Sequence, residues 1–264
     1  MDSTSHALQG ALRPQRTAAH PRPALVVAGA TGVLGAEVLR RLAGSGRFAH
    51  TGVMAREPIT TGLSGVSMML APDAPLEDWP ARAGAQIGVV MFEPPRLYYD
   101  RERALWTPTP GQLPALTRWL RRCGVQTLVL VMPHAQGRLP DALKRGLATL
   151  DEHDVAAAGF ERVLFVRSAQ TSQGIKPSGT FRKTAAWMLS TLSYMVPATE
   201  QPVRPSKIAE FIEAALRVLP AGTHVASPEL LWQAAQVGGK SQSGESIHSV
   251  VQAWLNGRPD VSWP

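Results

Sequence analysis

The sequence has little cysteine and no long apolar run. A single cysteine, Cys123, is present among 264 residues. This excludes a disulfide-stapled scaffold and a zinc or iron–sulfur site built from thiolates. No apolar run approaches the ~18 residues of a membrane span without a charge, and no secretory signal is visible. We therefore expect a cytoplasmic protein with no membrane segment.

Acidic residues are too few to balance the basic ones. Lysine and arginine number 27 against 20 aspartates and glutamates, which gives a net charge of +7. The arginines are scattered, and no basic cluster is interleaved with the aromatic residues that stack on bases. We therefore do not expect nucleic-acid binding, and the basic residues are instead available for an anionic ligand.

Length and composition fit a globular chain with one main core. Hydrophobic residues make up 44% and charged residues 18%, which excludes disorder across the whole chain. The length suits one large domain, or a core with a small lobe. Residues 1–23 hold Ser, Thr and Pro with no apolar period, so we expect a disordered leader there. We expect a core at 24–168, and a C-terminal lobe and tail at 169–264 interleaved with it.

Short apolar runs alternate with helical patterns along the core. The predicted strands are 24–28, 51–55, 66–70, 87–92, 127–132, 162–166 and 223–226. The predicted helices are 36–42, 113–122, 139–158, 181–194, 206–218, 228–236 and 246–255. Alternation at this spacing predicts a parallel sheet, and uncharged strands predict helices on both of its faces. We expect a three-layer, doubly wound α/β fold of the Rossmann-like type with a small helical C-terminal lobe.

A glycine run joins the first predicted strand to the first predicted helix. The glycines are Gly29, Gly32 and Gly35, spaced G-x-x-G-x-x-G. The first allows a tight turn, the second a close approach of a pyrophosphate, and the third close packing of the helix on the sheet. The N–H groups of the helix start would then face the phosphates. The alternative is a glycine-rich turn without a ligand.

The motif GATGVLG at 29–35 resembles the nucleotide loop of the short-chain dehydrogenase/reductase superfamily, particularly its atypical NAD(P)-binding members. The resemblance spans roughly residues 24–235, although outside the loop it concerns only the order and spacing of elements. It implies a dinucleotide-binding core at 24–168 and a substrate lobe over the cofactor. It also implies that the loop residues Gly29, Thr31, Gly32, Val33, Leu34 and Gly35 bind the cofactor.

The residue after the second predicted strand indicates which dinucleotide binds. Arg56 occupies this place, where an acidic residue would accept hydrogen bonds from a ribose 2′-hydroxyl and an arginine would pair with a 2′-phosphate. We therefore favour NADP(H) over NAD(H). Glu57 leaves the opposite preference open, because a shift of one residue would place its carboxylate at the decisive position.

The resemblance implies further cofactor contacts at the ends of other strands. Asp73 follows the third strand, where an aspartate of the family lies near the adenine, and Phe92 ends the fourth. Arg167 ends the sixth, beside the nicotinamide carboxamide. For Asp73 the alternative is a turn residue before a helix. Arg96 follows the fourth strand and could reach a phosphate or remain solvated.

The catalytic residues of the family are missing. Its reductases use a Ser or Thr after the fifth strand and a Tyr-x-x-x-Lys on the next helix, where positions i and i+4 share a face. Here the fifth strand leads into His134 without a Ser or Thr, and no tyrosine in the chain precedes a lysine by four residues. His134 and Lys144 are the candidate substitutes. The alternative is an ordinary loop histidine and a solvated lysine.

Two hypotheses follow for function. The first is an NADP-dependent oxidoreductase of atypical mechanism acting on a small carbonyl or related substrate, whose identity the sequence does not indicate. The second is a non-catalytic NADP(H)-binding redox sensor or assembly protein, with a protein partner or a second copy of itself. No metal is expected, because the acidic run 151–154 points in several directions from one helix.

Overall fold

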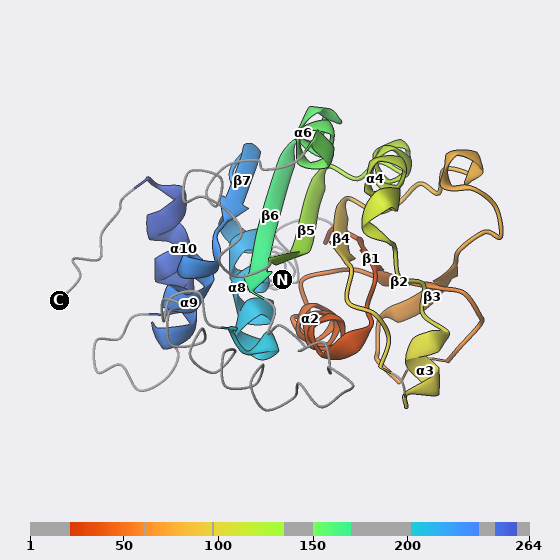
Figure 1. Ribbon diagram of the computed structural model, residues 1–264, viewed down its shortest axis with the longest axis horizontal. Helices are drawn as coiled ribbons and strands as arrows, with labels where there is room; N and C mark the ends of the chain where they lie inside the picture. The colour runs from red at the N-terminus through yellow and green to blue at the C-terminus, as the bar shows by residue number, and fades with distance from the viewer. Residues whose placement is uncertain are drawn as a thin grey trace, which may run out of the picture.

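The structure is a computed structural model that describes residues 22–60, 62–96, 98–134, 150–169, 202–237 and 246–257. These ranges form a seven-stranded sheet with helices on both faces (Figure 1). Every pair of neighbouring strands is parallel. The predicted fold class, a doubly wound Rossmann-like α/β protein, is therefore confirmed.

The strand order places one switch point beside the first strand. The strands are β1 (Leu25–Ala28), β2 (Thr51–Ala55), β3 (Val66–Leu70), β4 (Ile87–Met91), β5 (Thr127–His134), β6 (Arg162–Ala169) and β7 (Gly222–Ala226). Their order in the sheet is β3-β2-β1-β4-β5-β6-β7, so the direction of winding reverses between β1 and β4. In open α/β sheets this is the place where ligands bind, outside the carboxyl ends of the strands.

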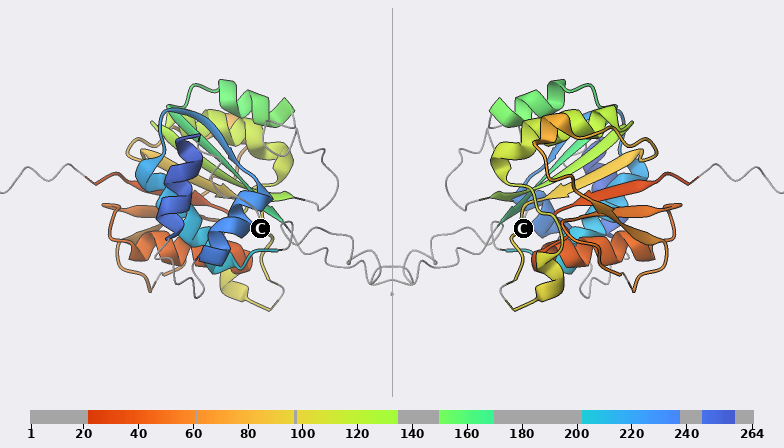
Figure 2. Two further views of the ribbon diagram at one scale, coloured as in Figure 1. Left: turned by 90° about the vertical axis from the view of Figure 1, so that its left-hand side faces the viewer. Right: turned by 90° about the vertical axis from the view of Figure 1, so that its right-hand side faces the viewer.

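The helices form two layers around the sheet. On one face lie α2 (Gly32–Gly44) and α8 (Pro205–Val218), with α9 (Pro228–Val237) and α10 (Ile247–Leu255) packed on α8. On the other lie α4 (Leu113–Arg122) and α6 (Leu150–Ala157) (Figures 1 and 2). Three short helices, α3 (Asp100–Arg103) and two 3₁₀ turns at Leu76–Asp78 and Pro110–Gln112, lie in the connections.

Side chains that alternate along the strands supply two separate cores. Val27 and Leu164 point to the α2 and α8 face, where they pack with Ile212. Their strand neighbours Ala28 and Phe165 point to the α4 and α6 face. Alternation of this kind is the period of two that a strand imposes, and both faces are apolar because both are covered by helices.

Several predicted boundaries differ from the structure, among them the end of β6, which runs to Ala169 rather than to residue 166, and two of the differences have identifiable reasons. Helix α2 begins at Gly32 rather than at residue 36, because glycines in its first turn lower the helical propensity of that stretch. Strand β5 continues to His134 and pairs there only with β6, since β4 ends at Met91. A proline is tolerated in such a one-sided extension, and Pro133 lies within it.

Several predictions fall on residues outside the described ranges. They include nearly all of the leader, the first part of the helix predicted at 139–158, and the helix predicted at 181–194. Within the part of the chain that the structure describes, no helix is both long enough and apolar enough to cross a membrane. The division of the chain at residue 168 stays a prediction, although β7, from beyond that point, completes the sheet.

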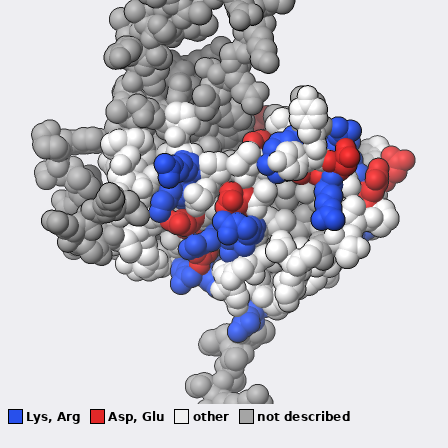
Figure 3. Space-filling view, turned by 90° about the horizontal axis from the view of Figure 1, so that it is seen from below, with Lys and Arg blue, Asp and Glu red and all other residues white. Residues whose placement is uncertain are grey.

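Charges of both signs lie next to each other on the face that carries α2 and α8 (Figure 3). Between α2 and α8, the buried Glu213 of α8 accepts hydrogen bonds from Arg41 of α2 at 2.9 Å and from Arg217 one turn further along α8 at 3.1 Å. Arg47 donates to the main-chain carbonyl of Glu213 at 3.3 Å. The Glu213 carboxylate therefore ties α2 to α8, and the main-chain carbonyl of the same residue ties the loop after α2 to α8.

Glu213→Gln tests this tie. The variant should lower the free energy of unfolding by about 2 kcal/mol, because it leaves two arginines without their shared carboxylate; the effect is moderated because both arginines are about half exposed. The matched control is Glu37→Gln, which breaks the exposed Glu37–Arg40 pair on α2 and should change the free energy of unfolding little. Urea unfolding measures both, and equal losses would contradict a special role for Glu213.

Candidate functional site

The glycine loop lies at the switch point, between the carboxyl end of β1 and the first turn of α2. Gly29 and Gly32 have φ values of +76° and +72°, which side chains disfavour. A Cβ atom on Gly29 would lie 1.9 Å from the carbonyl oxygen of Met91 in β4, and one on Gly35 would lie 2.7 Å from the carbonyl oxygen of Gly29. The tight turn predicted at Gly29 is therefore present, and at Gly35 the helix packs closely against the main chain of the loop.

The backbone N–H groups in the first turn of α2 have no hydrogen-bond acceptor from the N-cap side chain or from an acidic residue in that turn. Helix N-terminal N–H groups need acceptors, which an N-cap side chain or a first-turn acidic residue commonly supplies or supports. Thr31 is the N-cap residue, but its side chain makes no capping hydrogen bond, and the first turn holds no acidic residue. The Thr31 hydroxyl instead contacts the main-chain carbonyl of Glu93 at 2.5 Å and the Thr107 hydroxyl at 2.8 Å.

Two carboxylates from elsewhere in the chain accept these donors. The Gly32 N–H donates to Oε2 of Glu102 at 3.1 Å, and the Leu34 N–H donates to Oε2 of Glu93 at 2.8 Å. The Glu93 side chain also fills the space over Gly32, since a Cβ there would lie 2.2 Å from Cδ of Glu93. Anions thus occupy the place where a helix N-terminus would bind a phosphate, and they belong to the protein itself.

Arg96 holds the inner carboxylate in place. Its main-chain N–H donates to Oε2 of Glu102 at 2.9 Å and its Nε to Oε1 at 2.7 Å, while the guanidinium lies 3.8 Å from the centre of the Tyr99 ring. Burial alone would raise the pKa of Glu102. The hydrogen bonds from Arg96 and from the Gly32 N–H outweigh it, so the net pKa is lowered and the carboxylate form is favoured.

Both glutamates lie on one stretch of chain, residues 93–107, which we call the cover segment; residue 97 lies outside the described residues. The Trp106 carbonyl accepts the Gly29 N–H at 3.1 Å, and the Trp106 N–H donates to the carbonyl of Met54 in β2 at 3.0 Å. Leu105 pairs with Ala55 as an isolated antiparallel bridge. The cover segment therefore crosses the carboxyl ends of both β1 and β2.

A tryptophan cluster anchors the far end of the cover segment. The Trp106 ring is buried in the core beneath α4 and lies 5.2 Å from the ring of Trp79, which in turn lies 5.2 Å edge-on from Trp119. Aromatic pairs at this separation add to the stabilisation from burial. The other end of the segment is fixed by its attachment to β4. Both ends of the cover segment are therefore held by the core.

The predicted cofactor residues on other strands lie at the same edge of the sheet. Arg56 is exposed directly after β2, and its main-chain N–H donates to Ala104 of the cover segment at 2.7 Å. Asp73 is exposed after β3, which β2 separates from β1. Phe92 is half-buried against the core under α4. In the loop itself, Val33 is 46% exposed. Contact of any of them with a cofactor stays a prediction.

Arg167 has a structural partner that the sequence did not indicate. Its side chain is buried on β6 and donates through Nη2 to both carboxylate oxygens of Glu152 in α6, at 3.2 and 3.0 Å. The pair ties α6 to the sheet, on the face opposite α2. The cofactor contact predicted for Arg167 through its backbone stays a prediction.

The structure describes only the backbone of one of the two candidate catalytic residues, His134. The backbone of His134 ends β5 opposite Ala169 of β6, at the carboxyl edge where it was predicted. Its side chain and the whole of Lys144 lie outside the described residues. Among the residues that are described, no group of three His, Cys, Asp or Glu side chains could hold a metal ion.

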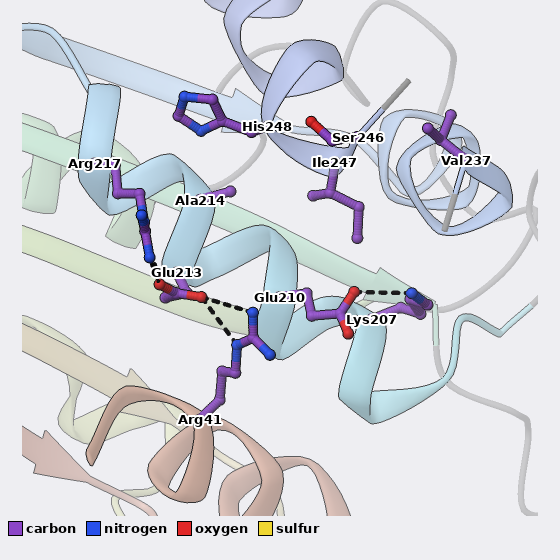
Figure 4. A pocket seen from close by; sticks show the side chains of 10 residues that line it. All are labelled: Arg41, Lys207, Glu210, Glu213, Ala214, Arg217, Val237, Ser246, Ile247 and His248. Atoms are coloured by element: carbon purple, nitrogen blue, oxygen red, sulfur yellow. Dashed lines mark hydrogen bonds and ion pairs between the residues drawn. The ribbon is translucent and has the colours of Figure 1, made fainter. Parts of the chain in front are cut away.

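A pocket lies away from the glycine loop, beside α8 and α10 (Figure 4). It has a volume of about 560 Å³. Its charged side chains pair with one another: Lys207 with Glu210 at 2.8 Å, and Arg41 with Glu213 at 2.8 Å. Ser246, Ile247 and His248 form the α10 side. Because these charges are matched within the wall, the pocket is better explained as a seam between helices than as a ligand site.

The residues present do not fit a dinucleotide in this arrangement. A pyrophosphate at the glycine loop would need the Gly32 and Leu34 donors that Glu102 and Glu93 already hold. It would also meet two carboxylates at close range, and like charges repel strongly where water is excluded. The loop can therefore accept a pyrophosphate only after these carboxylates have moved away.

The strand order and the glycine loop at its switch point define the class: a doubly wound α/β protein of the Rossmann-like type. The fold implied by the resemblance of the loop is thus present. No model of a known protein family matches the sequence, and no curated protein matches it.

The solved structures to which this chain is similar include the following three. MoeE5 in complex with UDP-glucuronic acid and NAD is 16% identical over 89% of this chain and 82% of its own, with a TM-score of 0.46. A nucleoside-diphosphate-sugar epimerase from Staphylococcus aureus is 15% identical over 91% and 92%, with a TM-score of 0.44. UDP-glucuronic acid 4-epimerase from Bacillus cereus in complex with NAD is 12% identical over 90% and 92%, with a TM-score of 0.42.

Glu102→Gln tests the charge state of the inner carboxylate. Folding lowers the pKa of Glu102 below its unfolded value of about 4.5. The carboxylate therefore contributes its full stabilisation of the folded state above the unfolded pKa, and this contribution is lost as the pH falls through the pKa of the folded state. We expect the variant to be less stable than the wild type by about 1–2 kcal/mol near neutral pH. This difference should shrink in acid, as measured by urea unfolding over a pH series.

The control for this series is Asp100→Asn, which removes one charge from the same segment at a side chain that is 92% exposed. It should change stability little at any pH. A difference between Glu102→Gln and the wild type that did not vary with pH would contradict the assignment.

Proposed function

We propose that the chain is a non-catalytic binding protein whose ligand is a nicotinamide dinucleotide, NADP(H) in preference to NAD(H). The observation that carries this proposal is the glycine loop itself, which lies at the switch point of a doubly wound sheet with its glycines in the required conformations. The proposal does not assign hydride transfer to the chain.

The preference for NADP(H) rests on Arg56. It is the first residue after β2 and it is exposed at the carboxyl edge. A guanidinium there can pair with a 2′-phosphate through two parallel hydrogen bonds. Glu57 follows it, is exposed too, and bonds through its main-chain N–H to Ala104. Arg56 is favoured over Glu57 because it stands nearer to the strand end.

The sequence supports binding without the reductase chemistry of the family it resembles. Each of the three tyrosines, Tyr98, Tyr99 and Tyr194, lacks a lysine four residues later. Strand β5 ends in Met132, Pro133 and His134, without the hydroxyl side chain that such a reductase places there. A proton donor of lowered pKa beside the nicotinamide is therefore missing in its usual form.

The alternative is an oxidoreductase of atypical mechanism, in which His134 supplies the proton and Lys144 a second cation. The position of His134 at the carboxyl end of β5 favours it. The two proposals differ in a simple measurement: oxidation of NADPH in the presence of a panel of small carbonyl compounds. Turnover that His134→Ala abolishes, with NADPH affinity unchanged, would establish the alternative.

Titration with NADPH and NADH, each added separately to the purified chain, tests the proposed ligand. NADPH should bind more tightly than NADH, and Arg56→Ala should weaken NADPH by roughly 10- to 100-fold, because a hydrogen bond to a charged group contributes about 1.5–3 kcal/mol. NADH affinity should stay nearly constant. Energy transfer from the seven tryptophans to the reduced nicotinamide supplies the readout.

The control variant is Arg82→Ala, another exposed arginine, which lies between β3 and β4. It should leave both affinities unchanged. Equal losses of NADPH and NADH in Arg56→Ala would mean that Arg56 does not recognise the 2′-phosphate. If neither nucleotide binds the wild type, nor the chain with Glu93 and Glu102 replaced by glutamine, the proposed function is wrong.

A further inference from the structure

We infer that Glu93 and Glu102 act as an internal ligand of the glycine loop, occupying its anion position and holding the nucleotide site closed until the cover segment moves. The inference rests on the proposed function in one respect: it takes the displacing ligand to be a nicotinamide dinucleotide. The contact itself is independent of that ligand.

The two carboxylates use the donors on which a phosphate would depend. Gly32 and Leu34 lie in the first turn of α2, and their N–H groups donate to Glu102 at 3.1 Å and to Glu93 at 2.8 Å. The positive end of the helix dipole favours an anion at this point, whether it comes from a ligand or from the chain. Carboxylate and pyrophosphate therefore compete for the same groups.

The charges around the loop make the two ligands mutually exclusive. Glu93 and Glu102 bring two negative charges, and Arg96 compensates one of them through its bonds to Glu102. The remaining negative charge suits the positive helix end. A pyrophosphate added to this arrangement would bring further negative charge against both carboxylates at hydrogen-bond range, which is strongly unfavourable in a partly buried site.

The cover segment is built so that its middle can move while its ends stay fixed. Met91 at the end of β4 and Trp106 in the tryptophan cluster are both buried in the core. Between them, Tyr98 and Tyr99 are 93% and 52% exposed, and α3 is only four residues long. Displacement of this middle part would remove Glu102 and Arg96 together and would leave the sheet intact. Glu93 lies next to the fixed end, so it would free Leu34 by rotation of its own flexible side chain.

The test compares the double variant Glu93→Gln, Glu102→Gln with the wild type. Removing both charges weakens the internal contact while keeping the shape of the side chains. NADPH affinity should rise roughly tenfold or more, since charge-assisted hydrogen bonds are about twice as strong as neutral ones. Asp100→Asn, on the same segment but 92% exposed, should leave the affinity unchanged.

Amide hydrogen exchange supplies a readout that needs no nucleotide. If the carboxylates hold the loop closed, the Gly32 and Leu34 amides should exchange faster in the double variant. The increase should match the gain in NADPH affinity, because both quantities follow the open fraction. Amides of β4 and β5 serve as the internal reference and should not change. Where the double variant does not fold, the single variant Glu93→Gln, at a half-buried side chain, is measured in the same way.

The outcomes separate the inference from the proposed function. Faster exchange at Gly32 and Leu34 without NADPH binding to any variant would support the internal ligand and overturn the proposed dinucleotide. Unchanged exchange, with NADPH bound equally by wild type and double variant, would overturn the internal ligand and leave the dinucleotide standing. If Asp100→Asn raised the affinity for NADPH as much as the double variant does, the gain would come from the lower negative charge of the segment alone. That outcome would also overturn the inference.

Discussion

The backbone donors at the start of α2 are the constraint on which this structure depends. A helix that begins directly after a buried strand cannot leave its first N–H groups without acceptors, because a buried unsatisfied donor costs as much as a lost hydrogen bond. A bound nucleotide is one solution. Here Glu93 and Glu102 provide another, and the path of the cover segment across β1 and β2 brings Glu102 there.

The glycines of the loop have reasons to be glycine that involve no ligand. A side chain at Gly29 would collide with the main chain of β4, and one at Gly35 would collide with the main chain of the loop itself. Backbone cannot move away as a side chain can, so both positions are set by the fold. Gly32 differs, because a Cβ there would meet the flexible side chain of Glu93. Whether a ligand can approach the backbone at Gly32 therefore depends on the position of the Glu93 side chain.

Most of the fold could be predicted from the sequence, because most of its strands are short apolar runs, and the central ones are buried on both faces. The segments 51–55 and 66–70 were predicted with their observed bounds. Glu93 could be placed at the carboxyl edge, since it follows β4 almost at once. Glu102 could not be placed, because its position depends on how the chain passes over β2 and into the tryptophan cluster. That path is set by contacts such as those of Trp106, which are distant in sequence.

Several of the arginines have a role that composition alone does not reveal. Three buried carboxylates are each held by arginine: Glu102 by Arg96, Glu152 by Arg167, and Glu213 by Arg41 and Arg217. Each joins one piece of the chain to another, so these arginines serve internal anions rather than an external one.

Glu152 accepts hydrogen bonds from Arg167, and this pair fixes α6 to the sheet. Glu213 accepts hydrogen bonds from Arg41 and Arg217, and its bond with Arg41 fixes α2 to α8. The Glu102 side chain also accepts a backbone N–H of the glycine loop, from Gly32. An external anion can replace a carboxylate only where the donors that remain can bind an anion. The N–H groups of a helix N-terminus can do so. The position of Glu102 is therefore one at which an internal anion and an external ligand can exchange.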